Sequence, residues 1–143
     1  MTLPSSVLPD AIELAVVGAH LTGLPLNREL VALGGTLVRA TCTAPVYRLF
    51  ELPGTTPRKP GLLRTADGDG SAIEIEIWSL RPDAFGTFVS RIPSPLGIGT
   101  LQLADGATAK GFHVEAFAVA GALDISAHGG WRSYLKSLAP VSA

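Results

Sequence analysis

One histidine of this chain, His20, stands in a setting suited to proton transfer. It follows a short apolar run, residues 14–17, which is typical of a buried strand that ends at Gly18. A glycine lets the backbone turn and come close to a ligand, and a second glycine, Gly23, follows the histidine. Because imidazole changes charge near neutral pH without help, the pattern predicts a small-anion site in which backbone N–H groups surround a proton carrier.

The composition limits the classes of partner. The 143 residues fit a single domain, of which 47% are hydrophobic, 16% are charged and the net charge is −1. This balance predicts no nucleic-acid binding, which needs a basic surface. The most apolar run, residues 116–123, is too short to span a membrane, and the start of the chain lacks a secretion signal, so we expect a cytoplasmic protein that binds no membrane. The single cysteine, Cys42, excludes an internal disulfide and fits a small buried side chain better than a nucleophile.

Apolar periodicity, glycines and prolines predict six or seven strands and three short helices. The expected strands cover residues 12–17, 36–43, 47–52, 62–64, 73–77, 101–103 and 108–119. The first two expected helices cover residues 26–33 and 82–92, and the last is capped by Asp124 or Ser126 and includes residues 131–138. Two proline-rich stretches, residues 53–61 and 93–99, are expected to form stiff loops. The pair Asp105 and Gly106 predicts a hairpin.

The short connections decide the expected fold class. Few of them are long enough for a parallel crossover, so we expect an α+β fold: a mixed, mostly antiparallel sheet curled toward a barrel, with short helices packed outside. Glu74 and Glu76 alternate with isoleucines and are expected on the solvated face of a half-buried strand. The expected organisation is a flexible lead-in at residues 1–10, a single domain at residues 11–138 and a tail at residues 139–143.

The remaining titratable residues favour structural roles over metal chemistry. His113 lies inside an expected strand and His128 lies near a helix start, so packing is expected for both. Three scattered histidines and one cysteine lack the spacing of a metal site, and Asp67 and Asp69 lack the rest of a calcium loop. We therefore expect no metal and no cofactor.

Four segments together resemble the C-terminal domain of allophanate hydrolase. They occur in that family's order and are residues 16–27 (VVGAHLTGLPLN), 47–62 (YRLFELPGTTPRKPGL), 92–99 (IPSPLGIG) and 124–135 (DISAHGGWRSYL). The resemblance extends from about residue 12 to residue 136. It implies a fold of the γ-glutamyl cyclotransferase type.

The resemblance also implies an activity. In the family, an amidase domain releases ammonia from allophanate, and the C-terminal domain is thought to decarboxylate the product, N-carboxyurea, during urea use. The family's catalytic histidine lies in a Gly-Ala-His-Leu loop and corresponds to His20. The chain has no room for an amidase domain, so the expected partners are a small anionic substrate and an amidase on a separate chain.

The expected substrate-binding residues lie around His20 or reach it from other segments. They are Gly18, Ala19, Leu21, Thr22, Tyr47 and Lys59. Main-chain N–H groups beside His20 would hold a carboxylate. The Lys59 ammonium would offset the substrate's charge, unless it is a solvated loop lysine. The Tyr47 hydroxyl would contact a ligand, unless its ring only packs on a strand.

Two other functions stay open. The chain could be a non-catalytic module that binds a small anion or an amidase partner, and its scarce charge suits a homodimer face. It could also act as a γ-glutamyl cyclotransferase. The loop at residues 91–97, where those enzymes place a catalytic glutamate, holds no acid, which argues against this activity.

Overall fold

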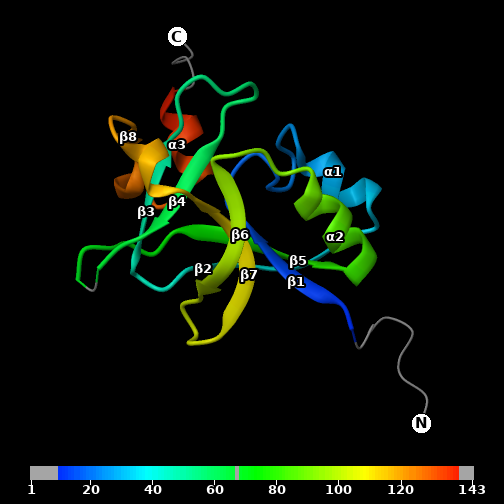
Figure 1. Ribbon diagram of the computed structural model, residues 1–143. Helices are drawn as coiled ribbons and strands as arrows, with labels where there is room; N and C mark the ends of the chain where they lie inside the picture. The colour runs from blue at the N-terminus through cyan, green and yellow to red at the C-terminus, as the bar shows by residue number, and fades with distance from the viewer. Residues whose placement is uncertain (1–9, 67, 139–143) are drawn as a thin grey trace.

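A computed structural model describes residues 10–66 and 68–138 of the chain (Figure 1). The described strands are β1 (Ile12–Val16), β2 (Thr36–Cys42), β3 (Tyr47–Glu51), β4 (Pro60–Arg64), β5 (Glu74–Leu80), β6 (Leu96–Gln102), β7 (Thr108–Val114) and β8 (Leu123–Asp124). The α-helices are α1 (Asn27–Ala32), α2 (Pro82–Ser90) and α3 (Trp131–Leu138), and short 3₁₀ turns cover Ala116–Val119 and Ser126–His128. The expected lead-in, apart from Asp10, and the expected tail lie outside the described residues.

Five strands form one mixed sheet in the order β2-β5-β1-β7-β6. Only the β1–β7 pair is parallel in this sheet, and the other neighbours are antiparallel. The expected hairpin at Asp105 and Gly106 is confirmed, because β6 and β7 pair along their whole lengths on either side of it. The parallel pair places the C-terminal end of β1 beside the C-terminal half of β7, and this is where the His20 loop begins.

Three strands form a second sheet in the order β4-β3-β8. It approaches the first sheet closely at Gly61, where an added Cβ would lie 2.8 Å from a methyl carbon of Val114. Helix α3 lies with this smaller sheet, whereas α1 and α2 lie together on the other side of the molecule (Figure 1). The mixed α+β class is therefore as expected. Within the described ranges neither sheet closes on itself, and the expected curling into a barrel is not confirmed.

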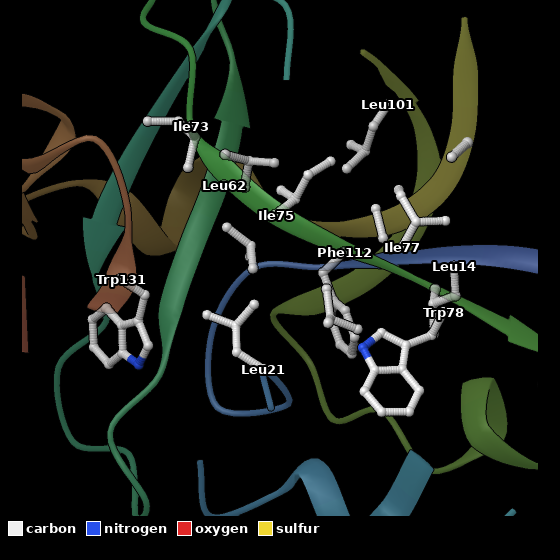
Figure 2. Close-up of a cluster of buried hydrophobic side chains, with 14 of the residues drawn as sticks. Leu14, Leu21, Leu62, Ile73, Ile75, Ile77, Trp78, Leu101, Phe112 and Trp131 are labelled. Carbon is white, nitrogen blue, oxygen red and sulfur yellow. The ribbon is translucent and has the colours of Figure 1, made fainter. Parts of the chain in front are cut away.

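The core lies between the two sheets and under the helices. Figure 2 shows side chains from β1, β4, β5, β6 and β7 converging in one buried cluster. Strand β5 is an interior strand, between β2 and β1, and its residues from Ile75 to Trp78 are all buried. The expectation of a solvated face holds for Glu74, which is exposed, and was wrong for Glu76, which is covered by Thr22 of the loop after β1 and by Arg132 of α3.

Three expected element boundaries also differ. Pro60 and Gly61, expected in a loop, are buried in β4, and Leu96, expected in the second proline-rich loop, begins β6. In both cases partner strands continue the pairing into a segment whose sequence is typical of turns. The long strand expected to run to residue 119 ends at Val114 and gives way to the 3₁₀ turn. None of the helices in the described ranges is long and apolar enough to cross a membrane.

Candidate functional site

The loop after β1 is held by its own carbonyl groups. The Leu21 N–H donates to the Gly18 carbonyl at 2.9 Å, and the Leu26 N–H donates to the Ala19 carbonyl at 2.9 Å. The Asn27 side-chain amide donates to the His20 carbonyl at 2.8 Å. All three carbonyls are therefore satisfied inside the loop or by the start of α1, which fixes the path of the chain around His20.

The N–H groups of the same three residues are in a different situation. Within residues 10–66 and 68–138, the N–H groups of Gly18, Ala19 and His20 have no hydrogen-bond acceptor. These residues line a small cavity together with Lys59 and Pro60. Because a buried N–H without an acceptor costs free energy, such groups are typical of a site that a polar ligand or water completes.

Gly18 is required by close packing. A Cβ at this position would lie 2.3 Å from Cδ of Pro60, and a proline ring cannot move aside as a flexible side chain would. The glycine therefore lets the β1 loop and the start of β4 come together. This approach brings Lys59, the residue before Pro60, next to the His20 loop.

The His20 ring is held by two aromatic rings and one carboxylate. Its centroid lies 5.1 Å from the Phe88 ring in an edge arrangement and 5.1 Å from the Phe112 ring in a stacked one. Its Nε2 lies 2.9 Å from Oε1 of Glu29 in α1, and its side chain is 13% exposed. Burial is the main cause that lowers the pKa of His20, and the charge of Lys59 adds a smaller decrease. Glu29 raises the pKa but does not cancel the decrease.

A larger cavity of about 230 Å³ adjoins this ring. Its walls combine His20 with apolar groups from α2 and β7, and its charged lining residues are Glu29, Lys59 and Arg91. Glu29 is engaged by His20, whereas Lys59 and Arg91 have no ion-pair partner in the described part of the chain. Two uncompensated cations beside a proton carrier favour an anionic ligand, and the volume suits a small one.

The structure brings only part of the predicted set together. His20, Gly18, Ala19 and Lys59 line the small cavity. Tyr47 lies elsewhere: its ring is 2% exposed in the core, and its hydroxyl oxygen accepts the Gln102 N–H at 2.9 Å.

Leu21 and Thr22 face the opposite side of the loop from this cavity. The N–H of Leu21 is occupied by the Gly18 carbonyl, and its side chain lines another cavity, of about 120 Å³, beside Glu76. Both the N–H and the hydroxyl of Thr22 donate to Oε1 of Glu76 at 2.9 Å. Neither residue therefore offers a spare N–H group for a substrate carboxylate.

Glu76 is the anchor of that opposite side. Its Oε1 also accepts the indole N–H of Trp78 at 3.1 Å, and its Oε2 accepts from Arg132 of α3 at 3.2 Å. Arg132 in addition donates to the Thr22 carbonyl at 2.6 Å. Burial alone would raise the pKa of Glu76, but these hydrogen bonds outweigh it and hold the pKa below its ordinary value. The group is a saturated structural carboxylate.

The charged and aromatic residues of the His20 cavity that sequence reasoning missed are Glu29, Phe88, Arg91 and Phe112. Glu29 had a usable signal, because it stands in the helix that directly follows the His20 loop. The phenylalanines read as ordinary core residues. Arg91 was noted only as the first residue of a loop without acids.

The other two histidines keep structural surroundings. His113 is exposed, and its ring lies across the β6 strand, within 2.7 Å of where a Cβ on Gly99 would stand. His128 packs against Tyr134 with the ring centroids 5.3 Å apart. Among the described residues no three histidine, cysteine or carboxylate side chains gather as metal ligands.

Comparison with known proteins decides the family. The model of the allophanate hydrolase C-terminal domain matches residues 12–136. The chain belongs to this family. The urea amidolyase of Saccharomyces cerevisiae is 44% identical to this family member over 131 residues, which is 90% of the chain and 7% of the relative. The chain therefore spans only a small part of the curated relatives it matches.

Solved structures of similar proteins share the fold. The crystal structure of Kluyveromyces lactis urea amidolyase superposes with a TM-score of 0.90 at 39% identity, covering 96% of this chain and 8% of that one. The structure of a uropathogenic E. coli-specific protein superposes with a TM-score of 0.81 at 34% identity, covering 88% of this chain and 96% of that one. An aig2-like mouse protein, at 16% identity and a TM-score of 0.56, shares the fold alone.

Proposed function

We propose that this domain binds a small N-carboxylated anion beside His20 and promotes its decarboxylation. The supporting observation is a pair of cavities that share His20 and Lys59: Gly18 and Ala19, whose N–H groups are unpaired, line the smaller one, and Arg91 lines the larger one. Membership of the allophanate hydrolase C-terminal domain family supports the choice of substrate class. The proposal requires no metal and no cofactor, since the reaction needs only a proton donor and a site for an anion.

Atom balance identifies the substrate more closely. Hydrolytic loss of ammonia from allophanate converts its amide to a carboxylate, which leaves one nitrogen carrying two carboxylates. N-carboxyurea is allophanate itself, so it is the starting material, and the earlier expectation that it is the product of the amidase was wrong. The substrate proposed for this domain is the nitrogen dicarboxylate, and the products are CO2 and carbamate.

The residues of the cavity supply complementary parts of this reaction. As the N–C bond breaks, its electron pair stays on nitrogen and takes a proton from the His20 imidazolium, while the carboxylate departs as CO2. Burial lowers the pKa of His20, which makes its imidazolium a stronger proton donor. The Lys59 ammonium and the Arg91 guanidinium hold the carboxylates, and the N–H groups of Gly18 and Ala19 offer further donors.

Replacement of His20 tests the proposal. An amidase that removes ammonia from 13C-labelled allophanate generates the substrate in place, and the rate of CO2 release is followed with and without this protein. Wild type should accelerate release, and His20→Ala should lose roughly 10²–10⁴-fold of that acceleration. His113→Ala serves as the control, because His113 is exposed and is not among the residues that line either cavity. Equal rates for wild type and His20→Ala would contradict the assigned role.

A non-catalytic anion-binding module is the second candidate. The two unpaired cations favour it, because they would hold an anion whether or not His20 transfers a proton. Iminodiacetate, which keeps a nitrogen between two carboxylates but does not lose CO2, separates the two functions. Binding of iminodiacetate without any acceleration of CO2 release would select the binding module. This chain covers only 7% of the yeast urea amidolyase and 8% of the K. lactis urea amidolyase structure. Binding to an amidase on a separate chain is therefore also part of this second candidate.

A further inference from the structure

The two nitrogens of the His20 ring have different surroundings. Nε2 lies 2.9 Å from the carboxylate oxygen Oε1 of Glu29. Nδ1 has no hydrogen-bond partner within the described ranges. A carboxylate at this distance accepts an N–H, so the neutral ring carries its proton on Nε2 and leaves Nδ1 with a lone pair.

The backbone that carries Glu29 is tied to the His20 loop. The main-chain N–H of Leu26 binds the Ala19 carbonyl, the Asn27 amide binds the His20 carbonyl, and the Glu29 N–H donates to the Leu26 carbonyl at 3.0 Å. The His20 loop and the first turn of α1 therefore form one hydrogen-bonded unit. The rings of Phe88 and Phe112 then restrict rotation of the imidazole from two directions.

We propose that Glu29 is the positioning residue of this site: it fixes the His20 tautomer, so that Nδ1 is the nitrogen that donates the proton. This inference builds on the proposed function. In the imidazolium form, Nε2–H points to Glu29, and Nδ1–H is the ring proton that remains for the substrate. The Nδ1–H proton moves to the substrate nitrogen, the N–C bond breaks and CO2 leaves. The ring is then neutral, with its remaining proton already on Nε2, and water returns a proton to Nδ1.

The charged groups around the ring set the sign of the expected pH effect. Glu29 from α1 stabilises the imidazolium, whereas Lys59 before β4 opposes it, and Arg91 after α2 is the third charge lining the cavity. The faces from α2 and β7 contribute only Phe88 and Phe112. Removing the Glu29 charge leaves Lys59 and burial acting together, so the pKa of His20 should fall further.

The first test is spectroscopic and needs no substrate. Ring 15N shifts of His20 are recorded across a pH titration in wild type, in Glu29→Gln and in Glu13→Gln. Glu13 is the matched control, because its side chain is 47% exposed, as is that of Glu29. Wild type should show the Nε2–H tautomer above the pKa of His20, and only Glu29→Gln should lower that pKa. A wild-type Nδ1–H tautomer, or a pKa that does not move in Glu29→Gln, would overturn the inference.

The second test is the pH profile of CO2 release. Because the reaction uses the protonated ring, the rate falls as pH rises through the pKa of His20, and Glu29→Gln should move this fall to lower pH. At a pH above the pKa of His20, the rate of CO2 release by Glu29→Gln should be roughly two- to fivefold lower than that of wild type. This is the range expected for a half-exposed ion pair. A protein that fails to accelerate CO2 release but shows the predicted 15N behaviour would contradict the proposed function while leaving the tautomer assignment intact.

Discussion

The two sides of the loop after β1 differ in how completely their polar groups are paired. On the His20 side, the N–H groups of residues 18–20 and the cations Lys59 and Arg91 have no partner in the described part of the chain. On the Thr22 side, a single carboxylate, Glu76, receives hydrogen bonds from three elements. A few residues of chain therefore separate an unsatisfied surface from a saturated one.

This difference indicates that one side of the loop holds the chain in place, while the other side is available to a ligand. A saturated, buried hydrogen-bond network resists movement, because breaking any member leaves another group without a partner. An unsatisfied set of donors is instead available to a ligand, and it is useful only if it is held in place. The Glu76 network holds Thr22, and the loop hydrogen bonds carry that rigidity to His20. Substitutions on the Glu76 side should therefore affect mainly stability, and the Lys59 substitution on the His20 side should affect ligand binding.

The largest expected effect is loss of the saturated side. Glu76→Ala should lower the free energy of unfolding by about 3 kcal/mol, because Glu76 is 8% exposed and its loss orphans the Trp78 indole N–H and the Thr22 N–H. Urea denaturation measures this. Glu74→Ala, two residues earlier on the same strand but exposed, is the control and should change stability by less than about 0.5 kcal/mol. Equal effects of the two variants would remove the contrast between the sides.

The next effect belongs to the unsatisfied side. Lys59→Ala should weaken iminodiacetate binding roughly tenfold, as expected for losing a charge-assisted contact of about 1.4 kcal/mol, and should leave unfolding unchanged. Titration calorimetry at two salt concentrations measures the affinity, and the wild-type advantage should shrink as salt rises. Lys136→Ala in α3 is the control for net charge. A Lys59→Ala protein that binds as well as wild type would show that this lysine is only a solvated loop residue.

The smallest effect is a pH dependence of stability carried by His20. Because burial lowers its pKa in the folded state, its contribution to stability is complete above the unfolded value of about 6.5 and is lost as the pH falls through the lowered folded value. His20→Gln should therefore flatten the stability curve in this range. Thermal unfolding at several pH values measures the slope. An unchanged slope would mean that the ring is as well solvated as in the unfolded chain.

Glu76 also has a lowered pKa in the folded state, so it too should lose its contribution to stability as the pH falls, but at more acid pH. Its contribution is present above the unfolded glutamate value and is lost as the pH falls through its lowered folded value. The two sides of the loop thus lose stability in two separate pH ranges, the His20 side first. The order of these two losses is a further difference between the two sides of the loop.

The local pattern of the chain predicted what depends on near neighbours. The strand that ends before Gly18, the turn at Asp105 and Gly106, and the helix over Trp131–Leu138 are all present close to where the sequence placed them. The segments that went wrong depend on distant partners. Pro60 is typical of a turn, yet it begins β4 because the β3 strand pairs with it. Glu76 is typical of a solvated strand face, yet Thr22 and Arg132 cover it.

The sequence by itself determined the family, the identity of His20 as the proton carrier to test, and the main-chain setting around it, since all of these are written in short contiguous segments. Only the tertiary structure decided which groups meet. It brought Glu29 and Arg91 to the cavity, removed Tyr47 from it, and engaged the N–H groups of Leu21 and Thr22 elsewhere. The physical reason is that hydrogen-bond saturation and burial depend on partners far apart in the chain, and these a local residue pattern does not record.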